Sequence, residues 1–291
     1  MVRIITMKHI LQHMRRLLLP AMLLLFSGCA ETPEPLRFVT TFEEHHPESS
    51  STEISQRTRM SSRLPGGQAH SYLLNEQSFT VHVPGAYRPQ GHYGVLVWMP
   101  PDDNNVSLPP EWQPALDRHK LIAVVPHPVQ AADQRNPFHH DIPLVLDAVH
   151  NINQQYSTDT NRIYIAGFFG SAIPASLIAF HFPDVFNGGI FIGEVGTWAD
   201  VTRKAISGKT RTYPAAFLQP GIRYFYQTQR DGRYVIIAGA DSRNRRRLET
   251  VYRDFFRSNL RHCAYMEIRG MGDEMPDAGR LERAVRRLES L

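Results

Sequence analysis

The stretch from Arg162 to Ala172 constrains the fold of this 291-residue chain more than any other. Residues 163–166 form a short apolar run suited to a buried strand, and two glycines then bracket a pair of phenylalanines in residues 167–170. From residue 173 the apolar side chains recur at a helical spacing. The sequence therefore predicts a strand, an abrupt glycine-bounded turn and a helix, a connection typical of parallel sheets covered by helices.

Similar apolar runs and helical patterns alternate through the rest of the chain. Strands are expected over residues 78–83, 93–99, 121–126, 188–193, 233–239 and 263–269. Helices are expected over residues 111–118, 245–260 and 276–291, and in a segment capped by Asp141, with Pro143 in its first turn and Leu144, Val145, Ala148, Val149 and Ile152 on its inner face. We expect a single α/β domain over residues 68–291, with a mostly parallel central sheet and helices on both faces.

The formal net charge of +4 comes from the amino terminus. Four basic residues and no acidic one lie before position 29, so the rest of the chain carries equal numbers of both signs. A basic surface field of the kind that binds nucleic acid is therefore not expected.

Residues 1–28 have the pattern of a secretory signal peptide. A basic flank precedes a ten-residue apolar run, Leu17 to Phe26, that is too short to span a bilayer. The tetrapeptide Phe26-Ser27-Gly28-Cys29 resembles the bacterial lipobox, with Phe where Leu is usual. This resemblance implies cleavage before Cys29 and acylation, including palmitate, of that cysteine; the alternative is a secreted protein in which Cys29 is incidental. Ala30 favours the outer membrane of the bacterial envelope.

Residues 29–67 are rich in Pro, Glu, Ser, Thr and Arg, and we expect a flexible tether. Residues 43–46 contain two acids and two histidines, but a solvated tract is favoured over a metal site because it lacks supporting partners. We likewise expect exposed imidazoles at residues 139–140 and no metal or other cofactor. The basic cluster over residues 243–247 is expected to be a solvated helix start, with an anionic ligand as the alternative. Cys263 is expected to be a buried, inert thiol.

Four segments carry a resemblance to a known family: residues 83–87, 159–167, 181–186 and 270–278. In this order and spacing they are similar to the secreted esterase branch of the α/β hydrolases, which includes polyhydroxybutyrate depolymerases and feruloyl esterases. The resemblance implies a single α/β-hydrolase domain. It also implies a serine nucleophile in a Gly-x-Ser-x-Gly turn, with a histidine and an acid.

The residues at the positions of this triad differ from the family pattern. Phe169 stands where the nucleophilic serine belongs, and Asp273 where the histidine belongs. Ser242 takes the position of the acid, although Asp241 beside it remains an alternative. A register shifted by two residues would instead make Ser171 the nucleophile.

The loop after the third strand usually supplies an oxyanion donor, but here it begins with Pro100, which has no N–H group. The remaining expectation for the site is a vestigial cleft. Its lining would comprise Trp98, Pro100, Phe168, Phe169 and Trp198.

The leading hypothesis is a lipid-anchored envelope protein whose esterase-like domain has lost catalysis and serves binding or scaffolding. The alternative is an active serine carboxylester hydrolase that uses Ser171. A third interpretation is a purely structural role in an envelope assembly. The expected partners are the membrane, through Cys29, and a small-molecule ester or an envelope protein.

Overall fold

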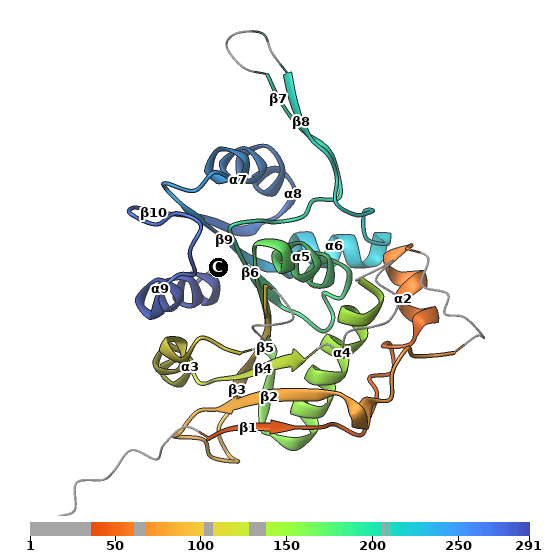
Figure 1. The fold of residues 1–291 in the computed structure, drawn as a ribbon. Helices are drawn as coiled ribbons and strands as arrows, with labels where there is room; N and C mark the ends of the chain where they lie inside the picture. Colours follow the sequence, from red (N-terminus) through yellow and green to blue (C-terminus); the bar gives the residue numbers. More distant parts are fainter. Residues whose placement is uncertain (1–35, 61–67, 102–106, 128–137, 205–207, 209) are drawn as a thin grey trace, which may run out of the picture. The chain divides into compact units, whose positions relative to one another are not determined.

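An eight-stranded sheet forms the centre of residues 33–291, in the order β1-β2-β4-β3-β5-β6-β9-β10 (Figure 1). The computed structural model describes residues 36–60, 68–101, 107–127, 138–204, 208 and 210–291. The strands of this sheet are β1 (Leu36–Thr40), β2 (Ser78–Val83), β3 (Tyr93–Met99), β4 (Leu121–His127), β5 (Thr158–Phe168), β6 (Gly188–Ile192), β9 (Arg233–Gly239) and β10 (His262–Ile268). β2 runs antiparallel to both of its neighbours, whereas every pair from β4 to β10 is parallel. The predicted mostly parallel sheet is confirmed.

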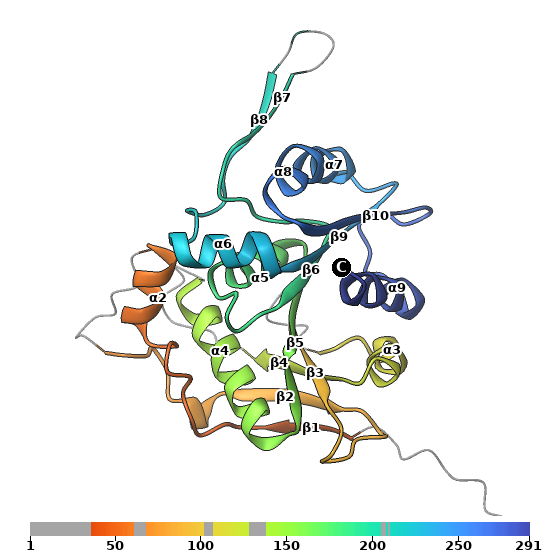
Figure 2. The same ribbon diagram turned by 180° about the vertical axis from the view of Figure 1, so that it is seen from behind.

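Helices cover both faces of the sheet (Figure 2). Their bounds, including the short 3-10 and π turns, are α2 (Ser51–Thr58), η3 (Leu74–Glu76), η4 (Pro110–Trp112), α3 (Gln113–Arg118), α4 (Phe138–Gln155), η5 (Phe169–Ser171), α5 (Ala172–His181), α6 (Ile222–Asp231), α7 (Arg245–Val251), η6 (Tyr252–Phe256), α8 (Arg257–Asn259) and α9 (Ala278–Glu289). Buried side chains of α3 and α9 pack on one face, and those of α4, α5 and α7 pack on the other.

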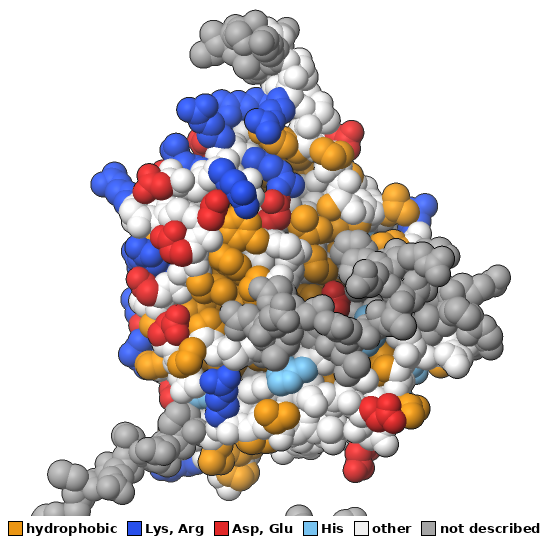
Figure 3. Space-filling view, in the orientation of Figure 1, with side chains coloured by type: hydrophobic (Ala, Val, Ile, Leu, Met, Phe, Trp, Pro, Cys, Tyr) orange, Lys and Arg blue, Asp and Glu red, His pale blue; other side chains and the backbone are white. Residues whose placement is uncertain are grey.

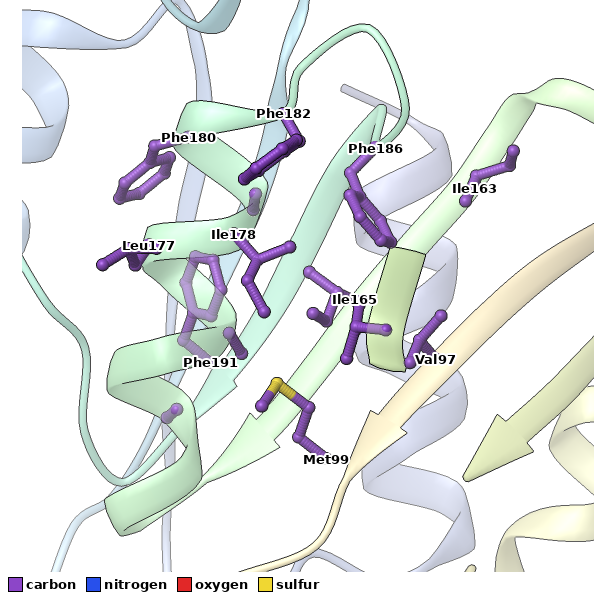
Figure 4. Close-up of a cluster of buried hydrophobic side chains, with 14 of the residues drawn as sticks. Val97, Met99, Ile163, Ile165, Leu177, Ile178, Phe180, Phe182, Phe186 and Phe191 are labelled. Carbon is purple, nitrogen blue, oxygen red and sulfur yellow. The ribbon is translucent and has the colours of Figure 1, made fainter. Parts of the chain in front are cut away.

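The central strands divide their side chains between these two cores with a period of two residues, as strand geometry requires. In β3, Val95, Val97 and Met99 belong to the core beneath α4 and α5, whereas Leu96 and Trp98 belong to the core beneath α3 and α9. Figure 4 shows the first of these cores, where β3 and β5 side chains meet those of α5. Burial on both faces explains why the strands are continuous apolar runs.

The predicted tether is wrong for residues 36–60. β1 pairs with β2 in the main sheet, and the side chains of Phe42 and Ile54 are buried in the core. Arg57 of α2 is also buried: it pairs with Glu48 and Asp184. These contacts attach the segment to the domain. The predicted signal peptide and Cys29 lie outside the described residues, as do residues 30–35 and 61–67.

Several local predictions also need correction. α4 begins at Phe138, so Asp141 lies within its first turn and is not its cap. His140 is buried and packs edge-on against Tyr72 at 5.2 Å between ring centroids, so its imidazole is not exposed. The hairpin of β7 (Val201–Lys204) and β8 (Thr210–Tyr213) and helix α6 were not expected; the hairpin projects away from the main sheet (Figure 1). In the described residues, no helix is long and apolar enough to cross a membrane.

Candidate functional site

The turn between β5 and α5 holds its apex residue in an unusual backbone conformation. Phe169 has a φ of 48°, in the left-handed region, where a residue with a Cβ costs about 1–2 kcal/mol. Gly167 comes so close to the following turn that an added Cβ would lie 2.6 Å from the carbonyl oxygen of Ser171. The first glycine of the turn is therefore required by packing, and Phe169 lies at the apex of a strained strand-to-helix turn.

The ring of Phe169 makes apolar contacts at this apex. It packs edge-on against Phe168, with 4.7 Å between the ring centroids. A Cβ added at Gly193, just after β6, would lie 2.5 Å from a carbon of the Phe169 ring. The ring therefore lies directly against the backbone at the end of β6. A phenyl ring has neither a lone pair nor a transferable proton, so this position cannot carry out nucleophilic attack.

Ser171, the alternative nucleophile, is buried, and its hydroxyl connects the turn to β3 by hydrogen bonding. Its Oγ lies 2.8 Å from the carbonyl oxygen of Met99 and 3.1 Å from that of Phe168, and it accepts a hydrogen bond from the Phe168 N–H at 2.9 Å. All of these partners are backbone groups. A serine nucleophile needs its hydroxyl directed at a base, whereas here the single hydroxyl proton is donated to the backbone.

The two positions assigned to the acid and the histidine are in direct contact. Ser242 Oγ donates to Asp273 Oδ1 at 2.6 Å, and it accepts from the Asn244 N–H at 3.1 Å. Arg243 Nε lies 3.2 Å from the other carboxylate oxygen of Asp273. The structure thus brings together the two residues that the resemblance placed in an acid–histidine pair. Asp241, the alternative acid, is exposed.

Polar groups at the end of β6 form a further cluster that the sequence analysis missed. The Asn244 side-chain amide donates to the carbonyl oxygen of Gly193 at 3.1 Å and to Glu194 Oε2 at 3.0 Å. Glu194 also forms an ion pair with Arg247. Only its position two residues after a buried strand could have singled out Glu194, because its partners come from a loop and helix some fifty residues away.

The basic cluster at the start of α7 is largely paired. Arg243 pairs with Asp273, Arg245 with Glu267 and Arg247 with Glu194, while Arg246 is exposed. Figure 3 shows basic side chains gathered over α7 and beside the β7–β8 hairpin, with acidic side chains among them. The ion pairs account for most of this cluster without a bound anion.

The predicted cleft is not formed by its two tryptophans. Trp98 is buried beneath α3 and α9 and packs edge-on against Trp112 at 4.8 Å between centroids. Trp198 is buried in the opposite core, edge-on to Phe180 at 5.1 Å. The sheet separates them, so both are packing residues. Pro100 directly follows β3 and is partly exposed.

A second polar cluster surrounds Asp147 of α4. Its carboxylate is fully buried and accepts hydrogen bonds from the backbone N–H of His46 at 2.7 Å and from the Tyr72 hydroxyl at 2.7 Å; His45 Nδ1 lies 2.8 Å away. Burial, together with the Asp147 charge, raises the pKa of Tyr72 far above its usual value, which keeps the phenol protonated and donating. This cluster attaches the amino-terminal segment to α4.

Other histidines adjoin this cluster without forming a metal site. His70 stacks on His45 at 3.6 Å between centroids and hydrogen-bonds to Ser49 at 3.0 Å. Burial lowers the pKa of His70 and of His46, which keeps both imidazoles neutral at neutral pH. Within the described ranges, no group of three or more His, Cys, Asp or Glu side chains is arranged to hold a metal ion.

Comparison with protein families and with curated proteins gives no match for this sequence. Solved structures do resemble it. The S-formylglutathione hydrolase FrmB from Staphylococcus aureus has a TM-score of 0.51 at 11% identity, over 87% of this chain and 98% of that one. One of two fungal esterases from Rhizomucor miehei has a TM-score of 0.54 at 8% identity, over 89% and 86% of the respective chains. A structure of FAE gives 0.54 at 11%, over 88% and 87%. The chain has the α/β-hydrolase fold, as the resemblance predicted.

Proposed function

We propose that this protein is a lipid-anchored component of the bacterial envelope whose α/β-hydrolase domain binds a ligand or partner without hydrolysing it. The observation that carries this proposal is the apex of the elbow turn, where Phe169 has the backbone conformation of a nucleophile and a side chain that cannot attack. The contact between Ser242 and Asp273 supports it, because the position of the histidine base holds a carboxylate whose two oxygens are engaged by the Ser242 hydroxyl and the Arg243 guanidinium.

The proposed binding role rests on the side chains that lie at the carboxyl ends of the central strands. Phe168 and Phe169 offer aromatic surface, and Asp273 and Arg243 offer charge. A small-molecule ester or an envelope protein is the partner proposed for this surface. The anchor would be acylated Cys29, and the outer membrane is the proposed location.

Ester turnover by the full-length protein tests the loss of catalysis. We expect no hydrolysis of short-chain aryl esters above background and no labelling by a serine-directed phosphonate. A Ser171→Ala variant is the matched control for the alternative in which Ser171 is the nucleophile. Turnover that disappears in this variant, together with phosphonate bound to Ser171, would show an active hydrolase and overturn the proposal.

The proposed anchor has its own test. Mass spectrometry of the amino-terminal peptide of the protein purified from bacterial membranes should show cleavage before Cys29 and acyl chains on that residue. An unmodified Cys29, or an intact segment before it, would refute the anchor and leave the proposal about catalysis untouched.

A further inference from the structure

The outer edge of β1 exposes apolar side chains at the border of the main sheet. Among the strands that the structure describes, β1 is terminal in the sheet order, and β2 is its one partner there (Figure 1). Leu36 is 66% exposed, Val39 64% and Phe38 37%, so both faces of the strand present apolar surface. An edge strand with exposed apolar residues favours association, and proteins usually cover or charge such edges. This edge therefore requires an explanation.

The chain ahead of β1 limits what can lie near that edge. Cys29 precedes Leu36 by seven residues, which reach at most about 25 Å when fully extended. A compact unit of roughly 260 residues has a radius of gyration of about 18 Å. A tether ending at residue 67 would have let the domain stand far from its anchor. Because residues 36–60 are part of the domain, an anchor at Cys29 holds the β1 edge close to the lipid.

We propose that the outer edge of β1 lies on the membrane surface, with Leu36, Phe38 and Val39 in contact with the headgroup region. This inference rests on the proposed acylation of Cys29. We place β1 at the headgroup level and not in the hydrocarbon core because of its backbone. The outward N–H and C=O groups of an edge strand have no partners in hydrocarbon, whereas water and headgroups at the interface can satisfy them. Arg37 lies in the same strand and suits anionic headgroups.

A second apolar patch on the domain provides an internal control. Ile222 and Tyr226 lie one turn apart on α6 and are 73% and 62% exposed. α6 packs on α5, away from the β1 edge (Figures 1 and 2). Apolar exposure alone would bring both patches to lipid equally, whereas the short connection to Cys29 favours β1.

Fluorescence quenching on vesicles tests this orientation. The acylated full-length protein, carrying Cys263→Ala, receives a fluorophore at Val39→Cys or, as the matched control, at Ile222→Cys. It is reconstituted on phosphatidylethanolamine–phosphatidylglycerol vesicles with nitroxide groups on the lipid headgroups. We expect quenching to be several-fold greater at position 39 than at position 222. A Leu36→Cys variant repeats the measurement in case the label at position 39 disturbs the strand.

Two outcomes would overturn the inference while leaving the anchor intact. One is equal quenching at positions 39 and 222 in protein that mass spectrometry shows to be acylated. The other is rapid disulfide formation between Val39→Cys residues of two copies, which would mean that β1 pairs with a second chain. An unacylated Cys29 would instead remove the anchor and the inference together, and the same mass spectrum identifies that case.

Discussion

The turn at Phe169 and the cluster around Asp147 combine backbone and side chains in opposite ways. At Phe169 the backbone is strained, and the side chain makes apolar contacts with Phe168 and Gly193. Around Asp147 the backbone is an ordinary helix, and a fully buried carboxylate is surrounded by hydrogen-bond donors. One region has a strained backbone with an apolar side chain at its apex; the other holds charged and polar groups in a structural role.

This difference shows that the elbow conformation does not depend on a catalytic serine. The contacts made at this turn are the close approach of Gly167 to Ser171, the Ser171 hydroxyl on Met99, and the Phe169 ring against Gly193. Strain of about 1–3 kcal/mol persists only when surrounding contacts determine the backbone. The Asp147 cluster should accordingly contribute more to folding than the apex of the turn, and the following variants can break or sharpen this comparison.

Replacing Asp147 should have the largest effect. Asp147→Ala leaves the Tyr72 hydroxyl, the His46 N–H and the His45 ring without their acceptor in a buried site. We expect the free energy of unfolding to fall by about 3–5 kcal/mol, measured by urea denaturation. Asp147→Asn is the control: it keeps one acceptor oxygen and the side-chain shape, so its loss should be clearly smaller. Equal, small losses in both variants would show that the cluster does not hold the amino-terminal segment.

Acid should weaken the fold through buried histidines. Burial lowers the pKa of His181, at the end of α5, to about 4, whereas a histidine in the unfolded chain titrates near 6.5. Between these values the unfolded chain binds a proton that the native protein does not. Stability therefore falls as the pH drops from about 6.5 to 4, by about 3 kcal/mol for this residue. The lowered pKa values of His46 and His70 act in the same direction.

Unfolding measured at pH 7 and at pH 4.5 checks this expectation. His181→Gln removes the titrating group while retaining a side-chain donor for the carbonyl oxygen of Leu177, 3.0 Å from His181 Nδ1. The variant should lose less stability on acidification than the wild-type protein. The same pH dependence in both proteins would mean that His181 is not the source.

The central sheet was predictable because each of its middle strands is buried on both faces. β3 and β9 have the predicted bounds because their apolar runs end at turn residues, and β2 has them because polar and apolar residues alternate along it. β1 and α2 were missed because they lie in a segment rich in polar residues: β1 exposes its apolar side chains and is attached through backbone pairing with β2, and α2 buries Ile54 beside the polar residues Arg57 and Thr58. A buried Arg57 looks like a solvated charge in sequence, and only its tertiary partners show otherwise.

The site was predictable only in part. The family resemblance indicated Ser242 and Asp273 as matching positions, and they do meet. It could not place Trp98 and Trp198, because the face of the sheet to which a tryptophan belongs depends on strand register and on loops. The cluster of Glu194, Asn244 and Arg247 also depends on tertiary approach.

Removing the Ser171 hydroxyl should have a moderate effect. Ser171→Ala loses the hydrogen bonds to Met99 and Phe168 that connect the turn to β3, and we expect a loss of about 1–2 kcal/mol in the free energy of unfolding. Ser242→Ala is a matched control, since that hydroxyl bonds to the partly exposed Asp273 and its removal should cost less. A Ser171→Ala variant as stable as wild type would mean that the turn does not depend on this hydroxyl.

The smallest effect isolates the backbone strain at the apex. Phe169→Ala and Phe169→Gly both remove the ring, but only glycine adopts a φ of 48° without a steric cost. Alanine keeps a strain of about 1–2 kcal/mol at this φ, which favours the glycine variant. Glycine in turn loses more conformational freedom on folding, which favours the alanine variant by about 0.5–1 kcal/mol. We therefore expect the glycine variant to be more stable than the alanine variant by about 0.5–1 kcal/mol in urea denaturation. If alanine is as stable as glycine, the turn has relaxed once the ring is gone, and the ring itself, packed on Gly193, is what maintains the elbow conformation.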